Sequence, residues 1–357
     1  MENMVDIKEF FNNRNVFITG HTGFKGAWLC NWLRLLNAKI HGYSLSPTLH
    51  SNVYQQTHLN KHLCSETLGN IQNIELLKKR LTKANPDVIF HLAAQPLVNI
   101  GYSNPVNTFH TNILGTVNLF EAVKVLNKDV TIINITTDKV YYNNDTHTAF
   151  SETSRLGGFD PYAGSKACVE LLSETYYNSY LKDLGIKLIN CRAGNVIGGG
   201  DYTLGRLLPD INHAYKNKTN LIVRHPDSVR PWQHVLEPIS VYLKLAAKVA
   251  NLKGSKFDHF NIGPTQDECV TVRNILDLVR DTIDTFSWEL SIDHTFHEAK
   301  FLSLDCKKIR EYLPYSATWG LERGVKETID WYLGDTKKDD MEKLTFDQIN
   351  RFSNGII

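Results

Sequence analysis

Short apolar runs alternate with longer stretches of helical periodicity through the first half of the chain. The apolar runs, each bounded by turn residues, predict strands at residues 15–20, 39–45, 87–94, 131–137 and 186–194. The stretches between them place apolar residues at helical spacing and predict helices at residues 25–38, 73–85, 105–127 and 160–184. Strands that alternate with helices pair in parallel through crossover connections. The pattern therefore predicts an α/β fold of the Rossmann type, with helices on both faces of a doubly wound parallel sheet.

The alternation of strand and helix patterns becomes irregular after Asn195, where glycine, proline and arginine become frequent. We expect a smaller C-terminal substrate-binding lobe of loops and short helices at residues 196–335, beside a cofactor-binding domain at residues 1–195. The run HFNIG, at residues 259–263, predicts a strand that returns to the main sheet. The tail, residues 336–357, begins as a charged linker, and we expect no more than a peripheral helix from it.

The stretch TGHTGFKGAWL places Gly20, Gly23 and Gly26 between the first predicted strand and the first predicted helix. Glycines let a turn close and let the backbone approach a ligand, and the free N–H groups of a helix N-terminus attract phosphate. An ordinary tight turn would also use glycines. The order of strand, glycines and helix in an alternating chain favours dinucleotide binding.

The end of the second predicted strand bears on which dinucleotide binds. An acid usually holds the ribose hydroxyls there, but this chain reads GYSLSPTLHS. No arginine or lysine lies between Lys39 and Lys61 to hold a 2′-phosphate. The pattern favours NAD over NADP, with Ser44 and Ser46 either as ribose contacts or as ordinary loop residues.

The stretch PYAGSKACVELL carries Tyr162 and Lys166 four residues apart, which places both on one face of a predicted helix. An ammonium beside a phenol favours the phenolate and so lowers the pKa of the tyrosine. A phenolate can take a proton from a sugar hydroxyl. Thr137 follows the fourth predicted strand, at the edge of the sheet where ligands bind, and could hydrogen-bond the same substrate oxygen. The alternative is a surface tyrosine and a solvated lysine.

Composition limits the classes of partner. The 357 residues include 39 Lys and Arg and 38 Asp and Glu, so a formal net charge of +1 gives no field to attract nucleic acid or an anionic membrane. No apolar run is long enough to span a bilayer, and the N-terminus lacks the basic-then-apolar order of a signal peptide. The six cysteines form no CxxC pair and no Cys/His cluster, which indicates free thiols, no metal site and a cytoplasmic protein.

Taken together, the motifs resemble those of the extended short-chain dehydrogenases, in TGHTGFKG, HLAAQPLV, TTDKVY and PYAGSK. Within that superfamily the chain resembles the CDP-glucose 4,6-dehydratases from Thr19 to Asp305, with DKVYYNN, GGFDPYAGSK, AGNVIGGGD, RPWQHVLEP and HEAKFLSLD in the family's order. The sister dehydratases for dTDP-glucose and GDP-mannose have a glutamate after the aspartate of TTDKVY. The CDP-glucose enzymes have a lysine there, which is Lys139 in this chain.

The resemblance implies conversion of CDP-glucose to CDP-4-keto-6-deoxyglucose, with NAD regenerated in each turnover. Hydride leaves C4 with Tyr162 as base, water is lost across C5 and C6, and hydride returns to C6. Thr137, Asp138, Lys139, Tyr162 and Lys166 are the implied catalytic residues. Asp138, if held protonated in a partly dry pocket, suits the acid for the C6 hydroxyl. Lys139 would be the C5 base or would stabilise the enolate, and an exposed Asp-Lys turn is the alternative.

The resemblance also implies which residues hold the two ligands. The expected cofactor contacts are Gly20, Thr22, Gly23, Phe24, Lys25, Gly26, Ser44, Asn70, Ile71, Leu92, Ala93, Ala94, Tyr162 and Lys166. The expected substrate contacts are Gln95, Asn195, Arg206, Leu207, Arg230, His234 and Glu298. Asn70 stands where the family usually has an acid that contacts the adenine amine. Guanidinium groups such as those of Arg206 and Arg230 match phosphate oxygens.

The long amphipathic helices at residues 104–127 and 162–183 are those through which relatives pair as a four-helix bundle. A homodimer is therefore implied, with a wholly internal role for the apolar stripes as the alternative. A 4-epimerase, or a dehydratase for another nucleotide sugar, also remains open. The pair Asp138 and Lys139 argues against an epimerase, and the presence of Tyr162 argues against a silent NAD-binding relative.

Overall fold

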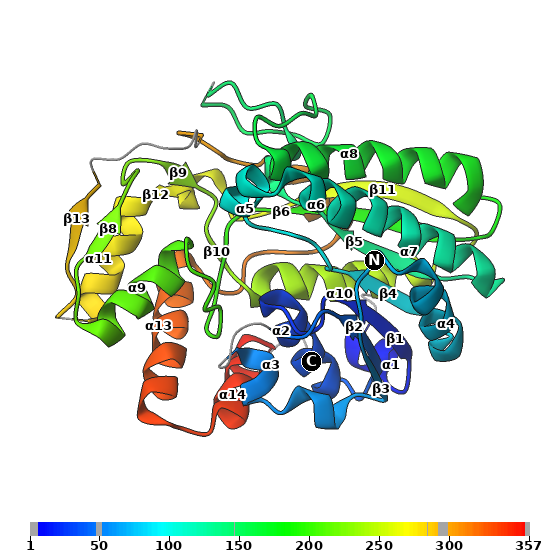
Figure 1. Cartoon of the computed structure of the whole chain (residues 1–357), viewed down its shortest axis with the longest axis horizontal. Helices are drawn as coiled ribbons and strands as arrows, with labels where there is room; N and C mark the ends of the chain where they lie inside the picture. The colour runs from blue at the N-terminus through cyan, green and yellow to red at the C-terminus, as the bar shows by residue number, and fades with distance from the viewer. Residues whose placement is uncertain (1–5, 48–51, 146, 284, 292–298, 354–357) are drawn as a thin grey trace.

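A parallel seven-stranded sheet forms the centre of the molecule (Figure 1). The structure is a computed structural model, and it describes residues 6–47, 52–145, 147–283, 285–291 and 299–353. The strand order is β11-β6-β5-β4-β1-β2-β3. Their bounds are β1 (Asn15–Thr19), β2 (Lys39–Ser44), β3 (Ser65–Leu68), β4 (Val88–His91), β5 (Thr131–Ile135), β6 (Lys187–Ala193) and β11 (Lys256–Ile262). The order reverses between β1 and β4, so the predicted doubly wound fold is confirmed, with its switch point at the end of β1.

Each face of the sheet has its own apolar core, because successive strand side chains point to opposite faces. On one face Phe17 of β1 and Ile132 of β5 pack with α4 (Ile74–Ala84) and α7 (Gly115–Val123). This face also carries the long helix that follows residue 160 (Figure 1).

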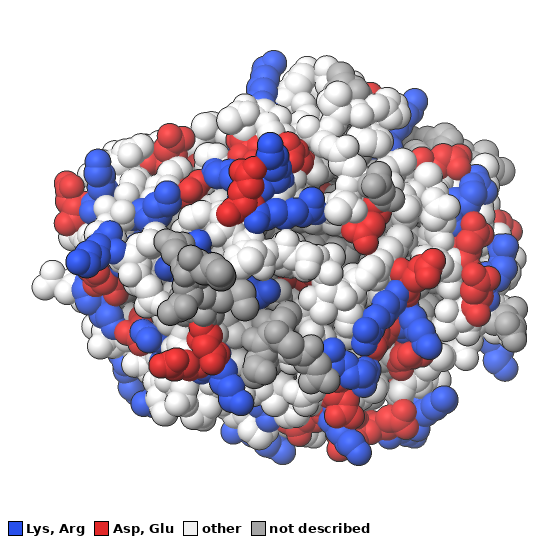
Figure 2. Space-filling view, turned by 180° about the vertical axis from the view of Figure 1, so that it is seen from behind, with Lys and Arg blue, Asp and Glu red and all other residues white. Residues whose placement is uncertain are grey.

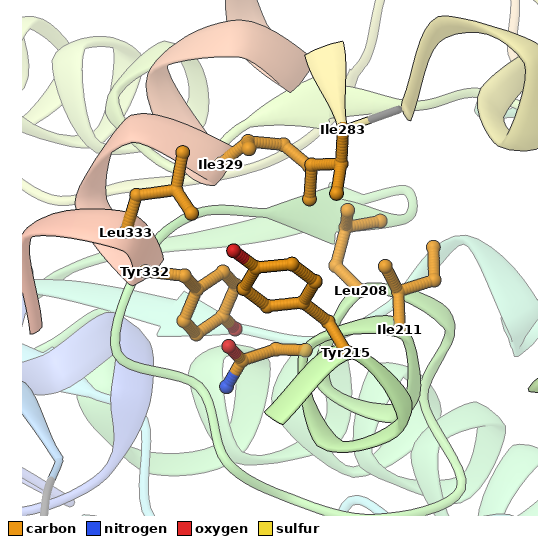
Figure 3. Close-up of a pocket in the computed structure, with 8 residues that line it drawn as sticks. Leu208, Ile211, Tyr215, Ile283, Ile329, Tyr332 and Leu333 are labelled. Atoms are coloured by element: carbon orange, nitrogen blue, oxygen red, sulfur yellow. The ribbon is translucent and has the colours of Figure 1, made fainter. Parts of the chain in front are cut away.

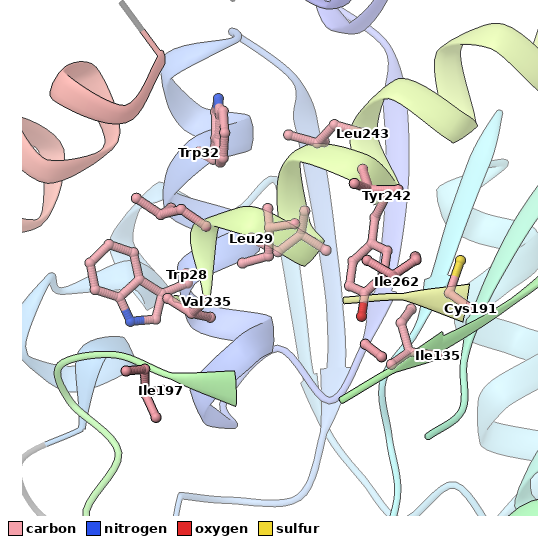
Figure 4. Packing of buried hydrophobic residues seen from close by; sticks show 14 of the residues in the cluster. Trp28, Leu29, Trp32, Ile135, Cys191, Ile197, Val235, Tyr242, Leu243 and Ile262 are labelled. Carbon is pink, nitrogen blue, oxygen red and sulfur yellow. The ribbon is translucent and has the colours of Figure 1, made fainter. Parts of the chain in front are cut away.

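The opposite face packs against α2 (Phe24–Leu35) and α10 (Leu236–Ala250). Figure 4 shows Trp28 of α2 and Tyr242 of α10 in this core, with Ile135 at the end of β5. The segment that forms α10 was expected in the C-terminal lobe. It lies against the sheet because nearly all of its side chains are apolar and buried, and it leads directly into β11, which pairs with β6.

The two long helices that follow β4 and β5 both contain a π-helical turn. The first runs through α6 (Pro105–Phe109), the π turn η2 (His110–Leu114), α7 and η3 (Lys124–Leu126). The second runs through α8 (Pro161–Tyr176) and the π turn η5 (Tyr177–Leu181). Asp160 starts α8, because its Oδ1 accepts the Ala163 N–H at 3.0 Å and proline occupies the next position. This cap fixes Tyr162 in the first turn of α8.

The C-terminal lobe lies beside the carboxyl ends of the strands and has little sheet of its own. Its helices are α9 (Leu207–Asn217), α11 (Val272–Thr282) and α13 (Leu321–Lys337). Its strands pair two by two, as β7 (Val196–Ile197) with β10 (Gln233–His234), β9 (Val229–Arg230) with β12 (Val270–Thr271), and β8 (Leu221–Val223) with β13 (Trp288–Leu290). The other short elements are α1 (Ile7–Phe11), α3 (Val53–Gln56), η1 (Leu59–His62), α5 (Val98–Ser103), η4 (Asp138–Val140), η6 (Gln266–Glu268) and α12 (Lys307–Tyr312).

The tail is part of the core, so the expectation of a peripheral helix was wrong. The last helix, α14 (Met341–Ser353), packs against α2 and α3. Phe352 is fully buried, and its ring meets the ring of Trp32 edge-on at a centroid distance of 5.6 Å. An ion pair of 2.7 Å joins Arg34 of α2 to Glu342 of α14. The apolar positions of α14 recur at helical spacing, and the groove between α2 and α13 buries them.

Acidic and basic side chains intermingle over the face of the molecule seen in Figure 2. This mixture agrees with the formal net charge of +1. In the part of the chain that the structure describes, no helix combines the length and the apolar character needed to cross a membrane.

Candidate active site

The glycine loop between β1 and α2 leaves no room for a side chain at two of its glycines. Gly20 has a φ of +80°, and a Cβ there would lie 2.8 Å from the backbone nitrogen of Ala93. A Cβ on Gly26 would lie 2.1 Å from the carbonyl oxygen of Gly20. Gly23 caps α2 without a side-chain hydrogen bond, so the first N–H groups of the helix have no intrahelical partner. A turn of this shape, with free N–H groups at a helix N-terminus, fits the pyrophosphate of a dinucleotide.

Phe24 and Lys25 open α2, and Lys25 connects the glycine loop with the rest of the site. Burial, and then the nearby guanidinium of Arg206, lowers the pKa of Lys25 to about 8, while Asp138 opposes this shift. Lys25 in turn helps to lower the pKa of Lys166. Three cations from separate parts of the chain thus lie within electrostatic reach of one another, in a region that suits anionic ligands.

The expected ribose and adenine contacts lie at the ends of β2 and β3. Ser44 ends β2, and its Oγ lies 2.8 Å from the Oγ1 of Thr22. Ser46 and Asn70 are exposed, and the Asn70 Oδ1 accepts a backbone N–H two residues further on, at 2.9 Å. Ile71 is buried. The hydroxyls of Thr22, Ser44 and Ser46 and the amide of Asn70 are therefore polar groups at this end of the site.

Beside the glycine loop, β4 is followed by three half-buried residues of the expected cofactor set, Leu92, Ala93 and Ala94. The Ala93 N–H donates to the Oγ1 of Thr19 at 3.2 Å. The Thr116 hydroxyl donates to the Asn112 carbonyl at 2.7 Å, so it accepts the Nε2–H of His91 at 3.1 Å. The Nδ1 of the neutral ring then accepts the Thr19 hydroxyl at 2.7 Å. Burial lowers the pKa of His91 to about 3, so the ring is neutral as this arrangement needs. The buried histidine ties the glycine loop to α7.

Gln95 was expected in the substrate cleft, but its amide is used within its own loop. Its Nε2 donates to the Leu97 carbonyl at 3.1 Å and to Thr108 at 2.9 Å, and its Oε1 accepts the Leu97 N–H at 2.7 Å. The Gln95 N–H donates to Asn112 in the π turn η2, and Asn112 donates to Ser165 of α8 at 2.8 Å. Gln95 therefore shapes the wall of the site. Asn112 was missed from the sequence, where nothing distinguishes it from a surface asparagine.

Tyr162, Thr137 and Lys166 come together at the carboxyl end of β5. The side chains of Tyr162 and Thr137 are hydrogen-bonded, and Tyr162 is 8% exposed. Burial nevertheless raises the pKa of Tyr162 to about 12. The Lys166 ammonium donates to the Ile135 carbonyl at 3.0 Å, and burial lowers its pKa to about 8. The Lys166 ammonium therefore lies against the carboxyl end of β5, and burial is the largest influence on the pKa of Tyr162.

The pair Asp138 and Lys139 is not an exposed turn. Asp138 is 2% exposed, and the Thr137 hydroxyl donates to its Oδ1 at 3.0 Å. Its Oδ2 is buried without a hydrogen-bond partner among the described residues. Burial raises the pKa of Asp138, and the charge of Lys139 and then the Thr137 hydrogen bond oppose this shift. Lys139 is half-buried beside it. The carboxyl group is therefore set up to hold a proton and to aim one oxygen at a ligand.

The expected phosphate contacts lie where the lobe meets the sheet. The Nη1 of Arg206 makes an ion pair of 2.7 Å with the Oδ2 of Asp201, and Leu207 follows as the first residue of α9. Arg230 is 3% exposed, and its charge acts on Asp138. Asn195 is half-buried after β6. The two guanidinium groups approach the site from different loops of the lobe.

His234, an expected nucleoside contact, is buried among aromatic side chains. It is 1% exposed, and its ring contacts those of Trp28 and Trp319 at centroid distances of 6.0 and 4.9 Å. Burial lowers the pKa of His234 to about 3. A histidine packed between tryptophans belongs to the core, and the predicted nucleoside contact stays a prediction. Glu298, the other expected nucleoside contact, lies outside the described residues.

A small apolar pocket in the lobe is separate from this site. It lies between α9 and α13, and its lining includes Leu208, Tyr215 and Ile329 (Figure 3). Its volume of about 10 Å³ has room for a single water. The pocket is too small for a nucleotide. Within the described ranges, no cluster of three or more His, Cys, Asp or Glu side chains could hold a metal ion.

Comparison with solved structures matches this fold to nucleotide-sugar enzymes. A dTDP-glucose 4,6-dehydratase from Bacillus anthracis, in complex with NAD, superimposes with a TM-score of 0.75 over 92% of this chain and 99% of that one, at 22% identity. A UDP-glucose 4-epimerase from Thermotoga maritima gives a TM-score of 0.78 over 90% of this chain and 99% of that one, at 21% identity. At these identities the match concerns the fold.

Sequence comparison is more specific. A CDP-glucose 4,6-dehydratase of Salmonella typhimurium is 39% identical over 345 residues, which are 95% of this chain and 95% of that protein. A dTDP-glucose 4,6-dehydratase of Haemophilus influenzae is 24% identical over 343 residues, 89% of this chain and 98% of that protein. The family profile described as GDP-mannose 4,6 dehydratase matches residues 17–328. The chain therefore belongs to the nucleotide-sugar 4,6-dehydratase family of the extended short-chain dehydrogenases.

Proposed function

We propose that the protein is a CDP-glucose 4,6-dehydratase that uses NAD catalytically and forms CDP-4-keto-6-deoxyglucose. One observation carries the proposal. The buried Asp138, with Lys139 beside it, stands against Thr137 and Tyr162 at the carboxyl end of β5. An enzyme that only oxidised and reduced C4 would need no second acid–base pair beside the tyrosine. The likeness to a CDP-glucose enzyme over 95% of the chain supports the choice of nucleotide.

The residues divide the chemistry between two stages. When bound, NAD would accept a hydride from C4 of the sugar and return it to C6. Tyr162 would take the proton of the 4-hydroxyl, since its oxygen is held by Thr137. In the second stage Lys139 would take the C5 proton, and C5 would regain a proton when the hydride reaches C6. Asp138 would give a proton to the departing 6-hydroxyl, so that water leaves, and its raised pKa favours the protonated form that this donation needs.

The glycine loop would hold the cofactor, and the lobe would hold the nucleotide sugar. Gly20 and Gly26 let the loop close tightly, since an added Cβ at either position would lie within 3.0 Å of backbone atoms. The N–H groups that open α2 would then face the pyrophosphate of the cofactor. Arg206 and Arg230 would meet the diphosphate of the substrate, with Asn195 and Leu207 beside them. Asp201 holds Arg206 in place through the ion pair of 2.7 Å.

Mass spectrometry of the product tests the proposal. The protein would be incubated with NAD in deuterated water and with CDP-glucose, dTDP-glucose, GDP-mannose or UDP-glucose in parallel. Loss of one water with gain of one deuterium, for CDP-glucose alone, is the expected result, since a proton from solvent replaces the one at C5. Water loss from a different nucleotide sugar would correct the substrate. An isomer of unchanged mass would point to an epimerase, and an unchanged sugar would refute catalysis.

We also propose that two copies pair through the helices that carry the site. Four large apolar side chains are exposed on α6, η2 and α8, namely Val106, Phe109, Leu114 and Leu171, with exposed fractions of 70, 38, 45 and 57%. Because α6 and η2 pack beside α8, these side chains suit a four-helix bundle between copies. Leu171→Glu should give a monomer by light scattering after gel filtration. Leu290→Glu, at an equally exposed leucine of β13, should leave the dimer intact.

We place the enzyme in the cytoplasm. All six cysteines are free thiols in the structure, and Cys64 and Cys168 are exposed. Exposed free thiols are typical of proteins in a reducing compartment. Fractionation of cells that produce the protein would test the assignment.

A further inference from the structure

One buried ion pair reaches both ends of the segment that carries the acid–base residues. At the start of this catalytic segment, residues 136–141, the Thr136 hydroxyl donates to the Oε1 of Glu170 at 2.5 Å. At its end, the Tyr141 hydroxyl accepts a hydrogen bond from the Nη1 of Arg192 at 2.9 Å. The Nη2 of Arg192 lies 2.9 Å from the Oε2 of Glu170, and the two side chains are 3% and 2% exposed.

Glu170 stands on the helix that carries the other catalytic residues. It follows Lys166 by one helical turn and Tyr162 by two turns on α8, so the three side chains share one face. Arg192 stands on β6, next to β5 in the sheet. The ion pair therefore joins the catalytic helix, the catalytic segment and the sheet in one network.

Most polar atoms of this network have a hydrogen-bond partner, so the orientation of its side chains is fixed. The Nδ2 of Asn190 donates to the Oε2 of Glu170 at 2.9 Å, and the Tyr141 hydroxyl lies 2.5 Å from the Oδ1 of Asn261. Asn261 in turn donates to the Phe150 carbonyl at 2.8 Å, and the rings of Phe150 and Tyr141 stack at 5.1 Å. A buried ion pair adds little stability over apolar residues of the same size. What this pair supplies, and an apolar pair would not, is a fixed direction for two hydroxyl groups.

We propose that Glu170 and Arg192 are positioning residues that set the place of Asp138 and Lys139 relative to Tyr162. The inference rests on the proposed function, since it concerns the stage in which water is eliminated. That stage requires the groups at C5 and C6 to act on a sugar already placed by Tyr162. A displacement of about 1 Å can slow such a step by roughly 100-fold without loss of the ligands.

Thr136→Val and Tyr141→Phe test the inference, because each removes one hydroxyl and keeps the shape of the side chain. Thr328→Val in α13 is the matched control, since the Thr328 hydroxyl is fully buried and bonds a backbone carbonyl outside the network. We would measure kcat, KM, the NAD dissociation constant and the isotope effect of CDP-[5-²H]glucose, at a temperature where every variant is folded.

Both network variants should lose about tenfold or more in kcat while KM and NAD affinity stay as in the unmodified protein. The isotope effect on kcat should rise in both, since removal of the C5 proton becomes the slow step. The control variant Thr328→Val should change neither kcat nor the isotope effect. A loss of stability alone would not raise the isotope effect.

Two outcomes would overturn the inference. Network variants with an unchanged kcat and isotope effect would show that the segment holds its place without the pair. A parallel rise in KM and loss of NAD affinity would show a general distortion of the site. If the unmodified protein releases no water from any of the four nucleotide sugars, the proposed function itself fails, and that result is visible before any variant is made.

Discussion

A single methyl group in the glycine loop should destroy the cofactor site. Gly26 lies in the first turn of α2, and a Cβ there would stand 2.1 Å from the carbonyl oxygen of Gly20 and 2.9 Å from the Cα of His21. Real Cβ atoms essentially never come within 3.0 Å of such atoms. The colliding atoms belong to the backbone, so Gly26→Ala must push α2 away from the loop. Overpacking of this kind costs about 1–3 kcal/mol, which exceeds the gain of about 1 kcal/mol from replacing a helical glycine by alanine.

The larger effect should be on NAD affinity. A hydrogen bond from the loop to a charged phosphate contributes about 1.5–3 kcal/mol, so losing one would weaken binding by roughly 10- to 150-fold. Isothermal titration calorimetry with NAD measures this loss, and thermal unfolding measures the change in stability. Gly164→Ala is the control, since nothing lies within 4 Å of its added Cβ in α8, and it should raise stability and leave NAD affinity unchanged. NAD affinity in Gly26→Ala equal to that of the unmodified protein would refute the assignment of this loop to the cofactor.

The remaining predictions concern the catalytic residues and the C-terminal helices. Tyr162→Phe should abolish turnover and leave NAD affinity nearly intact, because only the proton acceptor is lost; near-normal turnover would contradict its role as base. Lys139→Ala should still allow oxidation at C4, which absorbance measures, but should slow the loss of water, which mass spectrometry measures. An equal loss of both steps would mean that Lys139 only shapes the site. Asp335→Asn should lower the free energy of unfolding by about 1–2 kcal/mol at pH 7, because Lys216 and Tyr202 donate to this carboxylate. Burial alone would raise the pKa of Asp335, but the hydrogen bonds from Lys216 and Tyr202 outweigh it and lower the pKa. The contribution of the Asp335 carboxylate to the free energy of unfolding is therefore present above the pKa of about 3.9 in the unfolded chain. It is lost as pH falls through the lower pKa of the folded protein. Urea unfolding at several pH values should show the difference from the unmodified protein vanish in acid, and a constant difference would contradict this account.

The sheet could be predicted from the sequence because each central strand has a recognisable local sequence pattern. The runs that became β1, β4, β5 and β6 are rich in apolar residues, and each is followed by turn residues. The edge strand β3 (Ser65–Leu68) was missed, since SETL is polar and half-exposed and has no apolar pattern to detect. The helix α14 was underestimated for a different reason. Met341, Ile349 and Phe352 are at helical spacing and could have predicted a buried face.

The residues of the site also include some that the sequence could predict and some that it could not. Gly20, Gly26 and Tyr162 could be found because their motifs describe a local backbone shape or a local spacing. Glu170 and Arg192 escaped because a charged residue in a helix or strand reads as solvent-facing until its partner from another element is known. The two residues are 22 positions apart along the chain, and they lie on two different elements of the fold.

Helical spacing alone does not settle the expected effect of Lys166 on the pKa of Tyr162. The four-residue separation of Tyr162 and Lys166 places both side chains on one face of α8, but it does not set where a long lysine side chain ends. In the structure the ammonium ends at the Ile135 carbonyl, one strand residue before the catalytic segment. Burial is then the largest influence on Tyr162 and raises its pKa to about 12. Among the charges that act on Tyr162, that of Asp138 raises its pKa and that of Arg206 lowers it. In the proposed mechanism, the loop that would bind the diphosphate through Arg206 would therefore also favour the phenolate, and so would connect substrate binding with the first proton transfer.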